Sequence, residues 1–344
     1  MSVSELSGRS KAAIVVIVVL LATAGAVGYV LRARSAASSP AAAPAGAGPA
    51  GAPATPLPRE TSLEPGSLLM VRAGPSADSG TVLAVPGRGE SAARGTGLHC
   101  KRFYAAKGTA LCLRVTTGLV TRSEAVVLDD HLREKRAVPL SGVPSRARVS
   151  ASGRMAAWTF FVTGDSYLAT GFSTRAGILD TRTGKLVKSL EDFTLEMDGR
   201  THRAPDVNYW GVTFAADDNR FYATVSTGGR TYLIEGDFAA RRMRTLRENA
   251  ECPSLSPDGE RLVYKKRTGD AADPWRLYTL DLRTGQEKAL AETANVDDQA
   301  AWLDDRTVMY SRLRGDSSDV WTVPADGSGR PALLLRDAYS PAAT

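Results

Sequence analysis

Acidic and amide side chains in three short segments of the C-terminal half have the chemistry of a binding or acid–base site. They are Asn208, Trp210, Glu251, Asp297, Asp298 and Gln299. Carboxylates and amides offer oxygen acceptors to a cation, a sugar or a peptide amine, and neighbouring carboxylates such as Asp297 and Asp298 can also exchange protons. The alternative is structural, because Asp and Asn also form turns and cap strand ends.

The three cysteines suggest one cross-link and one free thiol. Cys100 and Cys112 flank a predicted hairpin centred on Ala106, and residues equidistant from a hairpin centre face each other. This predicts a disulfide in an oxidising compartment, with two unpaired buried thiols as the alternative. Cys252 is expected to be a buried free thiol. Because the chain has no Cys-x-x-Cys motif, no structural zinc site is expected.

The sequence contains no complete catalytic motif. Residues 164–167 read Gly-Asp-Ser-Tyr, which resembles the nucleophile block of GDS-type esterases. Ser166 would need a histidine held by a carboxylate, and His99, His131 and His202 do not lie in the late Asp-x-x-His arrangement of those enzymes. We therefore predict no catalytic residue, no metal and no cofactor.

The elements that position these residues repeat along the chain. An apolar strand, a tight turn and a second apolar strand recur at residues 148–158, 212–223, 253–264 and 301–310. A short apolar strand that ends in polar turn residues recurs at 82–86, 126–130, 178–181, 233–236, 278–281 and 320–324. Short strands repeated every 40–55 residues or so, without a helical period, are typical of a β-propeller.

Six copies predict an all-β, six-bladed propeller over residues 63–341, with seven blades as the second choice. A β-sandwich would not explain the copies. Residues 66–85 form only part of a blade, so we expect the two ends of the chain to complete one blade together. Loops that lead into the inner strands gather around one mouth of the central channel, which should bring the six candidate residues to a common rim. Residues 193–203 read as an additional Asp-Gly hairpin, a plausible partner contact.

The N-terminus is predicted to be a membrane anchor followed by a spacer. Residues 12–31 are uncharged and apolar and are long enough to cross a bilayer, with a cleavable signal peptide as the alternative. Residues 32–62 are rich in Ala, Pro and Gly, which favours an extended linker. The flanking charges are balanced, so the linker and the cysteine pair decide the orientation. We expect residues 1–11 in the cytoplasm and the propeller outside.

The overall composition is that of a folded protein without a surface for nucleic acid. Hydrophobic residues make up 43% and charged residues 23%, which excludes global disorder. The net charge of +6 is not gathered into a long basic run. Nucleic acid is therefore not an expected partner.

Residues 254–264, which read Ser-Leu-Ser-Pro-Asp-Gly-Glu-Arg-Leu-Val-Tyr, resemble the SPDG repeat of TolB-like, WD40-like propellers. The order of anchor, spacer and propeller resembles TolB-like membrane proteins of high-GC bacteria. The resemblance extends at repeat level over residues 66–341, although residues 151–153 and 304–305 depart from Pro-Asp-Gly. It implies the fold and leaves the function open, because propellers include both binding proteins and enzymes.

From these features we expect a membrane-anchored, extracytoplasmic and non-catalytic module that binds a protein, a peptide or a cell-envelope ligand. The alternative is an enzyme, a lyase or hydrolase that uses the channel-face carboxylates Asp297 and Asp298. A third possibility is a purely structural stalk. The partners expected from the sequence are thus the lipid bilayer, through residues 12–31, and an unidentified envelope protein or cell-wall ligand.

Overall fold

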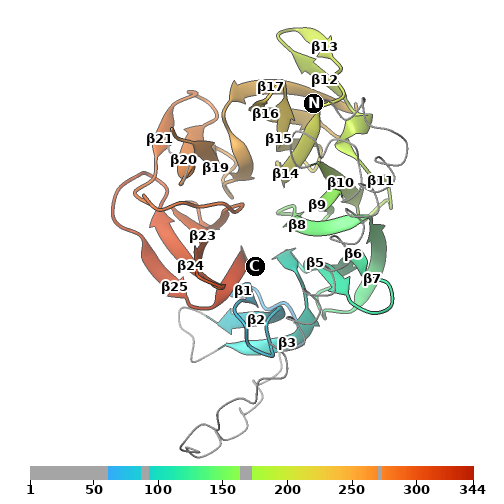
Figure 1. The fold of residues 1–344 in the computed structure, drawn as a ribbon, viewed down its shortest axis with the longest axis vertical. Helices are drawn as coiled ribbons and strands as arrows, with labels where there is room; N and C mark the ends of the chain where they lie inside the picture. The colour runs from blue at the N-terminus through green and yellow to red at the C-terminus, as the bar shows by residue number, and fades with distance from the viewer. Residues whose placement is uncertain (1–60, 87–92, 163–172, 270–272) are drawn as a thin grey trace, which may run out of the picture. The chain divides into compact units, whose positions relative to one another are not determined.

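The computed structural model describes residues 61–86, 93–162, 173–269 and 273–344. These residues form six β-sheets arranged as blades around a central axis (Figure 1). The prediction of an all-β, six-bladed propeller is therefore confirmed. Within these ranges no helix is long and apolar enough to cross a membrane. The predicted anchor, residues 12–31, and the linker up to residue 60 lie outside the described residues.

Each blade has its innermost strand at the axis. Blade 1 consists of β26 (Ala338–Ala343), β1 (Ser67–Arg72), β2 (Thr81–Pro86) and β3 (Arg94–His99). Blade 2 consists of β4 (Arg102–Ala106), β5 (Thr109–Thr116), β6 (Arg122–Leu128) and β7 (Glu134–Leu140). Blade 3 consists of β8 (Gly142–Val149), β9 (Met155–Val162), β10 (Thr174–Asp180) and β11 (Leu186–Val187).

The other three blades come from the second half of the chain. Blade 4 contains β14 (Asn208–Phe214), β15 (Arg220–Thr227), β16 (Arg230–Asp237) and β17 (Arg242–Glu248). Blade 5 contains β18 (Glu251–Leu255), β19 (Arg261–Arg267), β20 (Trp275–Asp281) and β21 (Glu287–Ala289). Blade 6 contains β22 (Ala301–Asp304), β23 (Thr307–Arg314), β24 (Ser317–Pro324) and β25 (Ala332–Leu335).

The two ends of the described chain close the ring, as predicted. The last strand, β26, pairs antiparallel with β1 and forms the inner edge of blade 1. The contact continues beyond the strands, where Gly66 donates to the carbonyl of Thr344 at 2.8 Å and Thr344 donates to Ser67 at 3.1 Å. Separating the ends would leave an inner strand unpaired, so this contact holds the ring shut.

The sequence repeats correspond to fixed positions in the blades. The four strand–turn–strand copies are the first and second strands of blades 3 to 6, and the six short copies are the third strand of every blade. The turn at residues 256–259 shows why its residue types recur. Asp258 accepts a bond from the amide of Glu260 at 3.0 Å, and Gly259 supplies a φ of 75°.

The Asp-Gly hairpin predicted at residues 193–203 is present. Its strands are β12 (Thr194–Met197) and β13 (Arg200–His202), joined by Asp198 and Gly199, both with positive φ. A short 3-10 helix, η4 (Leu190–Asp192), precedes them. Strand β12 pairs in parallel with β17, so the hairpin extends the outer edge of blade 4 and projects from the ring (Figure 1).

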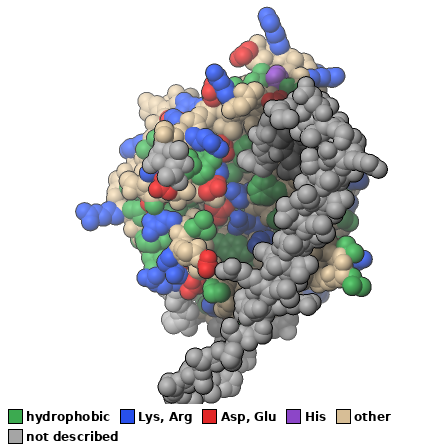
Figure 2. All heavy atoms as spheres, viewed as in Figure 1, with side chains coloured by type: hydrophobic (Ala, Val, Ile, Leu, Met, Phe, Trp, Pro, Cys, Tyr) green, Lys and Arg blue, Asp and Glu red, His purple; other side chains and the backbone are tan. Residues whose placement is uncertain are grey.

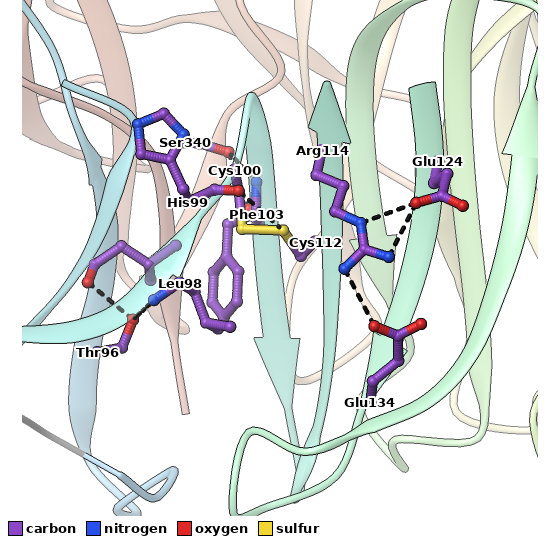
Figure 3. Close-up of a disulfide and its surroundings, with 11 residues drawn as sticks. Thr96, Leu98, His99, Cys100, Phe103, Cys112, Arg114, Glu124, Glu134 and Ser340 are labelled. Carbon is purple, nitrogen blue, oxygen red and sulfur yellow. Dashed lines mark hydrogen bonds and ion pairs between the residues drawn. A yellow bond between two sulfur atoms is a disulfide. The ribbon is translucent and has the colours of Figure 1, made fainter. Parts of the chain in front are cut away.

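A disulfide joins Cys100 to Cys112, with the two Cα atoms 5.5 Å apart (Figure 3). The bond is confirmed, but the expected register was wrong. The turn is made by Lys107 and Gly108, so the residue opposite Cys112 is Phe103. Cys100 lies just before β4, where the chain bends back and the amide of Lys101 donates to Leu113 at 2.7 Å. Cys252 is buried and free.

Neighbouring blades are joined by hydrogen bonds to bulges in the inner strands. Three inner strands contain a residue with positive φ whose amide turns away from its own sheet. Each amide donates to a hydroxyl in the second strand of the preceding blade; the pairs are Gly211 with Thr159 at 3.2 Å, Cys252 with Thr224 at 2.8 Å, and Ser340 with Ser311 at 3.2 Å. These bonds satisfy buried amides that the bulges would otherwise leave without acceptors.

Candidate functional site

The channel has two faces, defined here by the direction of the inner strands. The six inner strands are β26, β4, β8, β14, β18 and β22. We call the side on which they begin the start face and the side on which they finish the end face. All six predicted site residues belong to the start face, because they lie at the beginning of β14 and β18 or just before β22.

Glu251 and Asp297 share a buried lysine. The Nζ atom of Lys265 lies 3.9 Å from Glu251 Oε2 and forms a closer ion pair with Asp297. Arg267 lies 3.5 Å from the other oxygen of Glu251. Burial raises the pKa of Glu251, and the two cations oppose that shift only in part.

Asp298 is buried beside two arginines. Burial alone would raise its pKa, but Arg102, Arg146 and the backbone amide of Gln299 outweigh it and hold the pKa below its usual range. Arg146 Nη1 lies 3.7 Å from Asp298 Oδ1. The side-chain amide of Gln299 donates to the carbonyls of Val212 and Pro253, and thereby connects blades 4 and 5.

The structure therefore brings together four of the six predicted residues, Glu251, Asp297, Asp298 and Gln299. Each of the three carboxylates has a cationic partner, so none presents an unbalanced negative charge. Asp297 is the accessible member, with 52% of its side chain exposed.

Of the remaining two predicted residues, Trp210 lies beside Glu251, whereas Asn208 is bonded to blade 3. Asn208 accepts a bond from the amide of Thr174 at 3.0 Å and ties blade 4 to blade 3. Trp210 is buried, and with Glu251 it lines a groove of about 350 Å³ on the start face.

The basic residues of the channel were missed by sequence reasoning. Arg146 and Arg148 are two apart in β8 and so lie on the same face of the strand, and Arg102 is contributed by β4. Between these arginines and Asp298 only about 20 Å³ of space remains, enough for roughly one water. We call this narrow part of the channel, lined by Arg102, Arg146, Arg148 and Asp298, the neck. The sequence did contain a signal that could have revealed these arginines. Arg146 and Arg148 alternate with Ala147 in an inner strand, which lies at the channel axis.

Beyond the neck, the channel widens into a funnel of about 890 Å³ at the end face. Its wall includes the last residues of the inner strands, among them Ala106, Val149, Phe214, Leu255, Leu303 and Ala343. Arg148 and Tyr104 line both the neck and the funnel, and so form its floor. Figure 2 shows the hollow at the centre of the ring, with hydrophobic and basic side chains in it.

The chain reaches the propeller at the rim of this funnel. Leu63 is buried there and donates its amide to the carbonyl of Asp130 at 2.7 Å. Leu63 and Thr344 both line the funnel. The first and last described parts of the chain therefore meet on the end face.

The described residues contain no arrangement that activates a nucleophile. The nearest is a chain in which His202 Nε2 lies 3.0 Å from Thr227 Oγ1, which donates to Asp206 at 3.0 Å. In this chain the hydroxyl of Thr227 contacts both the histidine and the carboxylate. To activate a hydroxyl, the histidine would have to lie between the hydroxyl and the carboxylate. No cluster of His, Cys, Asp and Glu within the described ranges could hold a metal. Ser166 lies outside the described residues.

Comparison with known proteins supports the fold. No protein-family model and no curated protein sequence matches the chain. Its structure is similar to that of TolB from Acinetobacter baumannii, with a TM-score of 0.60 and 15% identity, over 80% of this chain and 66% of that one. A chain of a nidogen/laminin complex matches with a TM-score of 0.53 and 12% identity, over 80% of this chain and 97% of the other.

A puromycin-hydrolyzing peptidase from Mycobacterium tuberculosis has a TM-score of 0.48 and 17% identity, over 79% of this chain and 44% of the peptidase. The described chain is thus an all-β propeller of six blades with TolB propellers among its structural neighbours. It spans slightly less than two thirds of the Acinetobacter protein. At such identities the likeness concerns the fold, and function has to be argued from the site.

Proposed function

We propose that this protein is a non-catalytic binding module, anchored in a membrane by residues 12–31, that captures a protein, peptide or cell-envelope ligand in its end-face funnel. The observation that carries the proposal is the funnel itself. Its volume of about 890 Å³ lies within the range of roughly 300–1,000 Å³ that is usual for ligand pockets. Its wall is mainly apolar. The His–carboxylate pair among its described lining residues, His131 with Asp130 at 4.0 Å, lies exposed at the rim.

The proposed location is the extracytoplasmic side of the membrane, with residues 1–11 in the cytoplasm. The disulfide between Cys100 and Cys112 supports this side, because such bonds persist in oxidising compartments. Protease added to intact protoplasts should digest the propeller. If residues 60–344 survive while an external control protein is degraded, the orientation is wrong.

The start face is a second candidate surface for a ligand. Its groove beside Trp210 and Glu251 and the half-exposed Asp297 could receive a polar group. An enzyme acting through Asp297 and Asp298 is the weaker proposal, because Lys265 and Arg146 already engage both carboxylates. A general base in that position would first have to give up its ion pair.

Site-specific photo-crosslinking of the full-length protein in its native membranes tests the proposal. A photo-reactive residue would replace Leu303 in the funnel, Arg230 in the start-face groove, or Leu333 on the outer strand β25 as the matched control. We expect a discrete cross-linked product from position 303 that is absent from position 333. Cross-linked products from position 230 alone would show that the ligand binds to the start face. Equal products from positions 303 and 333, or none from either, would contradict the funnel as the binding site.

A further inference from the structure

Arg148 at the floor of the funnel is a buried cation that has no acidic partner among the described residues. It is 4% exposed. Its Nη2 atom donates to the backbone carbonyl of Ala300 at 2.9 Å, and its Nε atom has no acceptor. No carboxylate of the described residues forms an ion pair with it. Its neighbour Arg146, in contrast, lies within 4 Å of both Asp297 and Asp298.

This arrangement is energetically unfavourable. Removing a guanidinium from water is costly unless a counter-charge and hydrogen bonds replace the lost hydration. The guanidinium carbon of Arg148 lies 4.3 Å from the centre of the Tyr104 ring, a cation–π contact that offsets only part of the cost. A ligand that brings a negative charge to the floor would supply the missing partner.

The rest of the funnel does not neutralise Arg148. Two acidic residues, Glu64 and Asp130, belong to the lining, but both are exposed residues at the rim. Glu64 accepts a bond from the hydroxyl of Ser62, and Asp130 lies 4.0 Å from His131. Both carboxylates thus have other partners at the rim, and Asp298, which lines the neck together with Arg148, forms its ion pair with Arg146.

We infer that the funnel binds the C-terminal carboxylate of a peptide whose last residues are apolar, with Arg148 as its counter-ion. This inference rests on the proposed binding function and specifies its ligand. A planar guanidinium matches a carboxylate in shape and charge.

The funnel wall favours a peptide over an alkyl chain. Phe214, Leu255 and Leu303 provide apolar surface, while the exposed Lys107 and His131 also belong to the lining. A wall in which polar groups interrupt apolar ones suits a peptide, whose backbone carries polar groups between its side chains. A fatty acid would gain nothing from the polar positions.

The test uses the full-length protein in detergent and measures its thermal unfolding with defined probes. These are a pool of acetylated tripeptides with apolar side chains and a free C-terminal carboxylate, the same pool as C-terminal amides, and decanoate. We expect the acid pool to raise the unfolding temperature and the amide pool to bind at least tenfold more weakly. Replacing Arg148 by Gln should remove this difference between the pools.

Two control variants make the result specific. Arg122→Gln removes the same charge from an exposed position at the start of β6 and should bind like the unaltered protein. The Arg148→Gln variant should fold. Its unfolding temperature should equal or exceed that of the unaltered protein, because the substitution removes an unpaired buried charge. A large loss of stability in this variant would contradict the view that Arg148 awaits a ligand.

Each of the other possible results of the binding test would contradict one specific claim. Equal stabilisation by acid and amide pools would eliminate the carboxylate site but leave the funnel as a binding site. Binding of decanoate but not of the peptides, dependent on Arg148, would replace the peptide by an alkyl acid. If neither pool binds although position 303 cross-links to a partner in membranes, the peptide inference fails and the proposed function stands. Without that cross-link, both fail.

Discussion

The backbone amide of Cys252 donates a 2.8 Å hydrogen bond to the hydroxyl of Thr224 in the preceding blade. Cys252 has a φ of 50°, which places it in a bulge of its own strand and turns its amide towards blade 4. Gly211 and Ser340 make equivalent bonds to Thr159 and Ser311. The free cysteine thus belongs to a structural device that repeats at three blade junctions.

Replacing Thr224 by Val should destabilise the propeller, because the change keeps the shape of the side chain but removes the acceptor for a buried amide. We expect a loss of about 1–2 kcal/mol in the free energy of unfolding, measured by urea denaturation. Thr121→Val, on an exposed loop, should change little. Equal stability of both variants would show that the bond between the blades contributes nothing.

The disulfide should leave a single thiol for alkylation. After unfolding without reductant, the intact mass is expected to show one alkyl group, on Cys252, and none in a Cys252→Ala variant. Reduction of the bond between Cys100 and Cys112 should lower the unfolding free energy by about 2–3 kcal/mol, because the bond closes a short loop. Three alkylated cysteines would contradict both the bond and the proposed extracytoplasmic location.

Asp180 should make stability depend on pH in the acidic range. Its side chain accepts two bonds from Arg154, at 3.1 and 2.6 Å, and also amide bonds from Arg182 and Thr183. The bonds from Arg154 are the main reason that its pKa is held well below the usual range, against the opposing effect of burial. A lowered pKa contributes stability above the unfolded value of about 3.9, and this contribution is lost as the pH falls towards the folded value.

At pH 7, Asp180→Asn should therefore lower the unfolding free energy by about 2–3 kcal/mol, and the difference from the unaltered protein should shrink below about pH 4. Denaturation curves at several pH values measure it. Asp316→Asn, on an exposed turn, serves as the control and should give a small, constant difference. A deficit in the Asp180 variant that persists unchanged at pH 2.5 would refute the role of the charge.

The two adjacent carboxylates of the start face should respond differently to substitution. Asp298→Asn leaves the buried Arg146 and the nearby Arg102 with less negative charge, and we expect a loss of about 3 kcal/mol in unfolding free energy. Asp297→Asn should cost less, about 1–2 kcal/mol, because Asp297 is half-exposed and Glu251 remains 3.9 Å from the buried Lys265. If Asp297→Asn instead abolished ligand capture at unchanged stability, the start face would be the binding site.

Much of the architecture was predictable because its signals are local in the chain. Short apolar strands and turn residues such as Asp258 and Gly259 repeat along the chain, and each copy predicts its hairpin without reference to the rest of the molecule. The number of copies then set the number of blades, and the incomplete first copy predicted that β26 would join β1.

The strand register of the first hairpin in blade 2 was harder to predict from the sequence. The hairpin at Lys107 and Gly108 lacks the Asp found in the corresponding turns of blades 4 to 6, and the cysteine spacing alone predicts a centre at Ala106. The correct cysteines were still paired, because the chain before β4 bends back towards β5. A displacement of one or two residues in a turn cannot be resolved from propensity alone.

Only the tertiary structure decided whether the carboxylates of the candidate site are paired with cations. The sequence by itself determined that Glu251, Asp297 and Asp298 would lie near the channel, since residues before inner strands share a rim. Whether their charges are free depends on cations from other strands, such as Lys265, 32 residues from Asp297, and Arg146 in blade 3. That no carboxylate of the described residues forms an ion pair with Arg148 was likewise settled by the packing of distant strands. Charge pairing is a property of positions in space, and only the closed ring brings these positions together.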